Sequence, residues 1–149
     1  MAKKLIAVID VGSLTARLKI FEINAKGYPK TIETVRKYTT IGAKSVHGII
    51  PAEQVNELCS CLDAFSLKCK EYKVDHVICV ATSAFRDAGN RDVVLEQIRA
   101  KTGFKIEVLD NSMEARTAQV QGVTSLYTIT TRKNVNLQYH DAIRRVSDG

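Results

Sequence analysis

The sequence predicts an α/β domain built on one mixed sheet. Its first forty residues alternate as strands joined by short turns, and from Pro51 onward helical and strand-like patterns take turns. Sequential strands with short turns pair antiparallel, whereas a strand that follows a crossing helix pairs parallel. The expected order is three strands, helix, strand, helix, strand, helix, with the helices packed on the sheet.

The first three strands come from the N-terminal pattern. Two short apolar runs, Leu5–Ile9 and Leu18–Ile23, flank a polar turn and predict a hairpin. A second turn is expected at Asn24–Gly27. The segment Tyr28–Thr40 then alternates loosely, which predicts a third strand.

A long helix is predicted to begin after Pro51, whose missing N–H is not needed in a first helical turn. It continues to about Tyr72, and Cys61 lies off its apolar stripe and is expected to be partly exposed. The stripe comprises Val55, Leu58, Cys59, Leu62, Phe65 and Cys69.

The following segments predict two β-α units. Val74–Ala81 is a nearly continuous apolar run, as a buried parallel strand would be. A helical stretch is expected at Asp87–Asn90, then a helix that Asn90 caps, with Asp92 in its first turn, and that Gly103 ends. Phe104–Leu109 predicts the last strand, and Asn111 or Ser112 caps a final helix.

This order of elements matches the ribonuclease H-like fold, in which ligands gather at the carboxyl end of the first strand. Asp10 lies where that strand ends, beside a turn containing Gly12, Ser13 and Thr15. Turn amides can form an anion-binding concavity, which suits a phosphate with a metal ion next to it. The alternative is an ordinary hairpin whose Asp10 caps the turn.

A second candidate region is ATSAFRDAGNRD, at Ala81–Asp92, directly after the fourth predicted strand. Ser83 and its neighbouring N–H groups begin a helix, where backbone donors favour an anion. Arg86 supplies a guanidinium that can bind two phosphate oxygens at once.

Composition limits the functional classes. The 149 residues suit a single domain, with 45% apolar and 26% charged residues. We expect no membrane segment and no signal peptide, and therefore a cytoplasmic location. The four cysteines form no C-x-x-C pair and the three histidines are scattered, which argues against zinc. A net charge of +6 suits an anionic partner, although no dense basic block indicates a specific nucleic-acid site.

Three motifs together resemble those of the exopolyphosphatase/guanosine pentaphosphate phosphatase (Ppx/GppA) family: VIDVGSLTARL, VATSAFRDAGN and TGFKIEVLDNSMEAR. The resemblance covers about residues 5–122. It implies one ribonuclease H-like half of an actin-like ATPase-superfamily protein. It also implies Mg²⁺-dependent release of terminal phosphate from polyphosphate, or of the 5′ phosphate from guanosine pentaphosphate.

The resemblance also implies roles for individual residues. Glu114 would be the general base that orients the attacking water. Arg86 and Ser83 would bind phosphate, Asp10 would help to place Mg²⁺, and the turn with Gly12, Ser13 and Thr15 would form the first phosphate loop. Without the resemblance, Glu114 also fits a carboxylate at a helix N-terminus that interacts with the helix dipole.

The chain departs from the family pattern in three places. Leu14 stands where the family usually has Asn, and Asp110–Met113 replaces the usual Ser-Gly-x-Glu. The second phosphate loop, Asp-x-Gly-Gly-Gly-Ser-x-Glu, does not occur. We therefore expect an N-terminal domain at residues 1–122, a tail of unassigned role at 123–149, and no second domain.

Two other functions are alternatives to a weakly active hydrolase domain. A non-catalytic module that binds polyphosphate or a nucleotide would fit the missing loop and Leu14. A nuclease would need a second acidic residue near the end of the fourth strand, where the chain has Ala81-Thr82-Ser83 instead. An apolar surface that a second domain would cover predicts some self-association.

Overall fold

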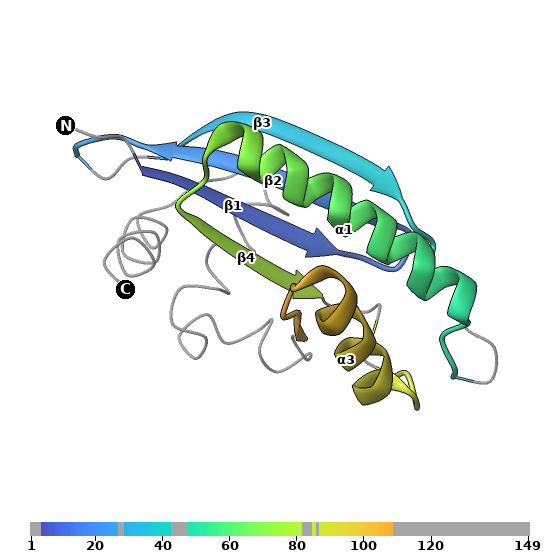
Figure 1. The fold of residues 1–149 in the computed structure, drawn as a ribbon. Helices are drawn as coiled ribbons and strands as arrows, with labels where there is room; N and C mark the ends of the chain where they lie inside the picture. The colour runs from blue at the N-terminus through green and yellow to red at the C-terminus, as the bar shows by residue number, and fades with distance from the viewer. Residues whose placement is uncertain (1–3, 27–28, 43–47, 82–84, 86, 109–149) are drawn as a thin grey trace.

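The computed structural model describes residues 4–26, 29–42, 48–81, 85 and 87–108. Within them the chain forms one twisted sheet with two long helices lying across it (Figure 1). The elements in chain order are β1 (Lys4–Val11), β2 (Thr15–Ile23), β3 (Pro29–Tyr38), α1 (Ala52–Tyr72), β4 (His76–Ala81), α3 (Arg91–Thr102) and β5 (Glu107–Val108).

The sheet has the mixed topology that the sequence predicts. Its strand order is β3-β2-β1-β4-β5. The three N-terminal strands pair antiparallel, whereas β4 pairs parallel with both β1 and β5. The antiparallel meander followed by parallel additions is therefore confirmed. The helix expected after β5 lies outside the described residues.

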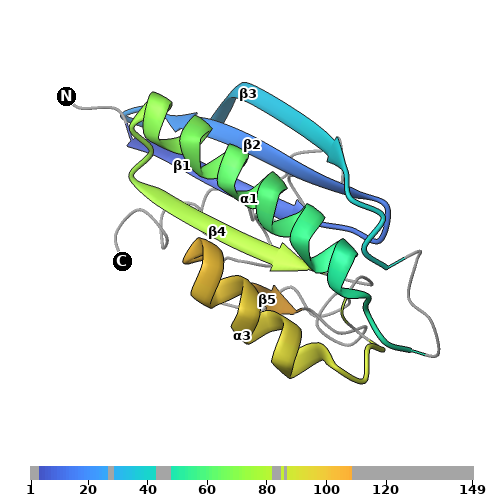
Figure 2. The same ribbon diagram turned by 45° about the vertical axis from the view of Figure 1, so that its right-hand side comes forward.

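Both described helices cover the same face of the sheet, as the two views in Figure 1 and Figure 2 agree. The main core lies between them and the sheet. Phe65 and Leu62 of α1 and Ile98 of α3 are fully buried there, against Ile9 of β1 and Leu18 of β2. Burial of such side chains is the main favourable term for this arrangement.

The central strand β1 is buried on both faces. Ala7, Ile9 and Val11 belong to the core under the helices, whereas Ile6 and Val8 belong to a second apolar cluster. Because side chains alternate along a strand, this separation gives the face of every β1 residue. The apolar run that the sequence shows in β1 is thus explained by its central position. The second cluster is completed by Phe21, Ile23 and the half-buried Ile78.

Two expectations about the region before α3 are wrong. Residues 87–90 form turns rather than a helical stretch, with Ala88 N–H donating to the Phe85 carbonyl at 3.3 Å. Asn90 occupies the N-cap position of α3 but makes no side-chain capping bond, because its amide is used by Ile50. Asp92 does lie in the first turn, and Gly103 ends the helix with φ +81°.

The expectation that Cys61 is partly exposed is also wrong. It is 5% exposed, and burial raises the pKa of its thiol to about 11. The reason is that Cys61 lies toward the sheet, near Lys37 of β3 and Cys79 of β4, so the buried side of α1 is wider than one apolar stripe. Pairing of the last strand is also shorter than predicted, since only Glu107–Val108 pair with β4 among the described residues.

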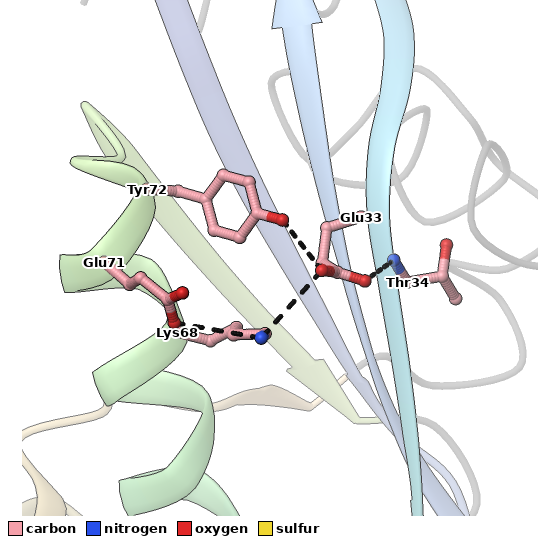
Figure 3. Close-up of polar contacts among 5 residues, drawn as sticks. All are labelled: Glu33, Thr34, Lys68, Glu71 and Tyr72. Atoms are coloured by element: carbon pink, nitrogen blue, oxygen red, sulfur yellow. Dashed lines mark hydrogen bonds and ion pairs between the residues drawn. The ribbon is translucent and has the colours of Figure 1, made fainter.

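A polar network ties the edge strand β3 to the last turns of α1 (Figure 3). The Glu33 carboxylate accepts hydrogen bonds from the Tyr72 hydroxyl at 2.8 Å and from the Thr34 N–H at 3.0 Å. Lys68 lies 4.0 Å from the same carboxylate and 3.8 Å from Glu71. The Tyr72 hydrogen bond, followed by that of Thr34, lowers the pKa of Glu33 below its ordinary value of 4.5.

Tyr72→Phe is expected to reduce the acid sensitivity of folding. A carboxyl group whose pKa is lowered in the folded state stabilises above its unfolded pKa and loses that contribution as pH falls. The difference in unfolding free energy between the unaltered chain and Tyr72→Phe should therefore be present at pH 6 and shrink below pH 4.5. Urea unfolding at a series of pH values measures it. A difference that stays constant down to pH 3 would contradict the role assigned to Glu33.

Candidate functional site

The carboxyl ends of three strands meet at one edge of the sheet. Val11, the last residue of β1, pairs with Ala81, the last of β4, and Ala81 pairs with Val108 of β5. The three arrows point the same way in Figure 2. From these ends the chain continues into the turn at residues 12–14, into residues 82–86 and into the segment from 109. Each of the three candidate motifs therefore follows a strand that ends at this edge.

The structure describes four of the predicted site residues. Asp10, Gly12, Ser13 and Thr15 lie in the β1–β2 hairpin or at its base. Ser83, Arg86 and Glu114 lie outside the described residues, and their roles stay predictions.

The hairpin turn is tight, and Gly12 is required for closeness rather than for an unusual backbone angle. Its N–H donates to the Thr15 carbonyl at 2.8 Å, and a Cβ on Gly12 would lie 3.1 Å from that same oxygen. The Gly12 amide is therefore used to close the hairpin. In this geometry, the Gly12 amide is not available for the phosphate contacts that the loop is predicted to make.

The turn is held from one side by the residues that follow β3. Gly42 N–H donates to the Ser13 carbonyl at 3.0 Å, and the N–H groups of Thr39 and Thr40 both donate to the Leu14 carbonyl, at 3.0 and 3.1 Å. These bonds fix the direction in which the turn faces. No short sequence motif indicates this contact between Gly42 and Ser13.

A buried amide supports the same segment from α1. Gln54 is only 3% exposed. With its nitrogen facing β3, it donates to the Thr39 carbonyl at 2.9 Å and to Thr40 Oγ1 at 3.0 Å, an orientation that satisfies the amide. A buried polar group that gains such partners avoids a large desolvation cost. Gln54 therefore helps to position residues 39–42, and through them the turn.

Asp10 lies half-buried on the face of the sheet opposite to α1 and α3. It shares this face with Val8 and lies across from Arg17 in β2 and Val80 in β4. The Asp10 charge also affects Cys79: burial raises the pKa of that thiol most, and the nearby Asp10 charge raises it further.

All four cysteines are free and buried, and none is predicted to act as a nucleophile.

The surroundings of Asp10 are compatible with Mg²⁺ held jointly with a substrate. Within the described ranges, no three His, Cys, Asp or Glu side chains come together as a protein-only metal site. Mg²⁺ at phosphate-handling sites typically takes one or two carboxylates and completes its coordination with water and phosphate oxygens. A single carboxylate at a strand end suits that kind of site.

A second support connects the start of α1 with the segment before α3. Asn90 accepts a hydrogen bond from Ile50 N–H and donates one to the Ile50 carbonyl, both at 3.0 Å. Gly89 N–H donates to the Gly48 carbonyl at 2.7 Å. Residues 48–50 and 89–90 are thereby held together. The sequence predicted a cap at Asn90, and it could not distinguish a cap from this bridge because both use the same side-chain atoms.

The fold and this strand-end edge define one ribonuclease H-like half of an actin-like ATPase-superfamily protein. The model of the Ppx/GppA phosphatase family matches residues 20–137. The chain belongs to that family, as the motifs predicted.

Individual relatives agree with this assignment. Exopolyphosphatase 1 of Mycobacterium leprae is 30% identical over 112 residues, which are 74% of this chain and 33% of that protein. A guanosine-5′-triphosphate,3′-diphosphate pyrophosphatase of Pseudoalteromonas translucida is 28% identical over 115 residues, 77% of this chain and 23% of the relative. The chain therefore spans about a third or less of these relatives.

The crystal structure of the Aquifex aeolicus Ppx/GppA family member superposes with a TM-score of 0.73 at 28% identity. The match covers 89% of this chain and 42% of the other. The predicted α/β, ribonuclease H-like fold is thereby confirmed.

Neither α1 nor α3 has the length and apolar character that crossing a bilayer requires.

Proposed function

We propose that the chain is the N-terminal domain of a phosphoanhydride hydrolase. The hydrolase releases terminal phosphate from polyphosphate, or the 5′ phosphate from guanosine pentaphosphate, and this domain alone is weakly active. Residues 1–122 form the domain, and 123–149 have no assigned role. The observation that carries the proposal is that β1, β4 and β5 end at one edge, so that three family motifs follow strands ending side by side.

The chemistry needs a positioned water and neutralised phosphate charge. Glu114 accepts a proton from the attacking water while the oxygen of that water bonds to the terminal phosphorus. The bond from that phosphorus to the bridging oxygen breaks, and the shortened chain leaves with the electron pair. Ser83, Arg86 and the turn with Ser13 and Thr15 bind phosphate oxygens. Mg²⁺ at Asp10 supplies charge neutralisation when bound.

A non-catalytic binding module is the second candidate. The observation that favours it is Leu14, which is 56% exposed at the tip of the hairpin. Where the family usually has an amide donor, this chain therefore presents an apolar side chain to solvent. Such a change removes a contact that would orient the reacting phosphate but leaves charged groups that hold it.

The cellular setting is part of the same proposal. Four free cysteines among the described residues support a reducing compartment, and we place the protein in the cytoplasm. Three large apolar side chains near strand ends or before α1 are exposed: Leu14 in the hairpin turn, Tyr38 at the end of β3 and Ile49 shortly before α1. These apolar side chains support self-association, or packing against a second domain, at this edge.

The test measures phosphate release and binding with polyphosphate and Mg²⁺. The unaltered chain is compared with Glu114→Gln, Arg86→Ala and the control Arg99→Ala, which changes an exposed arginine of α3. Arg86→Ala should weaken polyphosphate binding about ten-fold at low salt, the size expected for a charge-assisted contact. Arg99→Ala should leave binding unchanged.

The outcomes separate the two candidates. Phosphate release that Glu114→Gln removes supports the hydrolase. Binding without release, in a folded sample, supports the non-catalytic module for this chain. An equal loss of polyphosphate affinity in Arg86→Ala and Arg99→Ala would contradict the phosphate-binding role of Arg86 in both candidate functions.

A further inference from the structure

Three basic side chains lie together on the face of the sheet that carries Asp10. In the pairing of β2 with β3, Arg17 lies directly opposite Arg36, and Lys19 is two residues farther along β2, opposite Thr34. Residues two apart on a strand share a face and are separated by about 7 Å, and paired strands lie about 5 Å apart. Arg17, Lys19 and Arg36 therefore form one compact basic patch.

Lys19 and Arg36 have little opposite charge around them within the described part of the chain. Along this face of β1, β2 and β3, Asp10 is the acidic residue that the alternation places there, and it lies across from Arg17. The salt bridges and side-chain hydrogen bonds found among described residues include neither Lys19 nor Arg36. Like charges placed opposite one another on a sheet are destabilising, so this arrangement carries a cost.

The electrostatics of Lys19 show that the three charges act on one another. Burial lowers the pKa of Lys19 most, and the neighbouring charges of Arg17 and Arg36 lower it further. Arg36 is exposed and Lys19 is half-buried, so an anion in solvent can reach both. A bound polyanion would relieve the repulsion among them.

We propose that Lys19 and Arg36, beside Arg17, form a second anion site that binds the phosphate chain of polyphosphate beyond its reacting end. The proposal rests on the function proposed above. Its position supports this ligand, because the row Asp10, Arg17, Arg36 runs across β1, β2 and β3 from the proposed Mg²⁺ residue toward the edge of the sheet. A linear polyphosphate offers repeated charges that can engage several cations at once, whereas one phosphate ion cannot.

The chain offers a matched control on the same strand. Lys37 follows Arg36 in β3 but faces the other side of the sheet, where it lines a surface hollow with Glu53, Asn56 and Glu57 of α1. Lys37→Gln removes the same charge as Arg36→Gln and changes the net charge equally. The two variants therefore separate the patch from general electrostatic attraction.

The experiment measures the affinity of the full chain for long-chain polyphosphate, for orthophosphate and for a single-stranded oligonucleotide at several salt concentrations. Arg36→Gln and Lys19→Gln should each weaken polyphosphate binding about five-fold and reduce the magnitude of its salt dependence by about one counter-ion, as expected when one polyanion contact is lost. Lys37→Gln should change polyphosphate affinity by less than about two-fold, since its charge lies on the far face. Orthophosphate binding should be unchanged in all three. Circular dichroism and thermal melting should show that each variant is folded.

Four results would overturn the proposal. Equal losses in Arg36→Gln and Lys37→Gln would show general charge attraction only. If Arg36→Gln weakens the binding of single-stranded nucleic acid as much as that of polyphosphate, the patch is a general polyanion surface. If Arg86→Ala weakens polyphosphate but Arg36→Gln and Lys19→Gln do not, the second site fails while the proposed function stands. If the unaltered chain does not bind polyphosphate, both fail.

Discussion

Phe65→Ala is expected to lower the free energy of unfolding by about 3–5 kcal/mol, the usual cost of removing a fully buried phenyl ring. Phe65 is 1% exposed and lies in the core between α1 and the sheet. The loss combines the transfer free energy of the ring with that of the cavity left behind, because close-packed neighbours relax only in part. Urea unfolding followed by circular dichroism measures it.

The control for this prediction lies two residues away on the same helix. Leu67 is 67% exposed, and Leu67→Ala should change stability by less than about 0.5 kcal/mol, as surface substitutions do. Similar losses in the two variants would mean that α1 does not pack on the sheet through the side of Phe65. A loss below 1 kcal/mol in Phe65→Ala alone would mean the same.

Gly42→Val is expected to destabilise the fold by about 1–3 kcal/mol and to displace the proposed phosphate loop. A Cβ at position 42 would lie 2.8 Å from Ser13 Oγ, 2.9 Å from Ser13 Cβ and 3.1 Å from Ser13 Cα. The last of these is backbone, so a side-chain rotation of Ser13 does not relieve the overlap. The hydrogen bond from Gly42 N–H to the Ser13 carbonyl would be lost or lengthened as the two segments separate.

Two measurements check this prediction. Unfolding in urea gives the stability change. Polyphosphate binding, measured under conditions where the variant is fully folded, reports the position of the loop. Gly89→Ala is the control, because the nearest atom to its new Cβ is the flexible Ile49 Cδ1 at 3.4 Å. Gly42→Val with unchanged stability would show that residues 39–42 do not pack against the turn.

The described secondary structure was largely predictable because local pattern and tertiary position agree. The apolar runs of β1 and β2, the stripe of α1 and the glycine that ends α3 each specify their element without help from distant residues. Exceptions arose where a distant partner decided. Asn90 has the side chain of a cap, but Ile50 lies close enough to take both of its hydrogen bonds. Cys61 lies off the main stripe, but strands β3 and β4 pass close enough to bury it.

The candidate site divides in the same way. The residue types of Asp10, Gly12, Ser13 and Thr15 and their position after a strand were visible in the sequence. Ser83, Arg86 and Glu114 depend on motif resemblance, and their geometry lies outside the described residues. Gly42 and Gln54 support the turn through contacts with Ser13, Thr39 and Thr40, and no sequence spacing announces such contacts.

By itself, the sequence predicted the order of the described strands and main helices and the family, and it supplied the candidate residues for phosphate chemistry. These follow from short-range periodicity and from motifs within a few residues. Only the tertiary structure decided which side chains meet across strands. Arg17, Lys19 and Arg36 look like scattered charges along the chain, and the register of β2 against β3 brings them together on the face that carries Asp10. Register depends on the pairing of whole strands, because a shift of one residue would move every side chain to the other face.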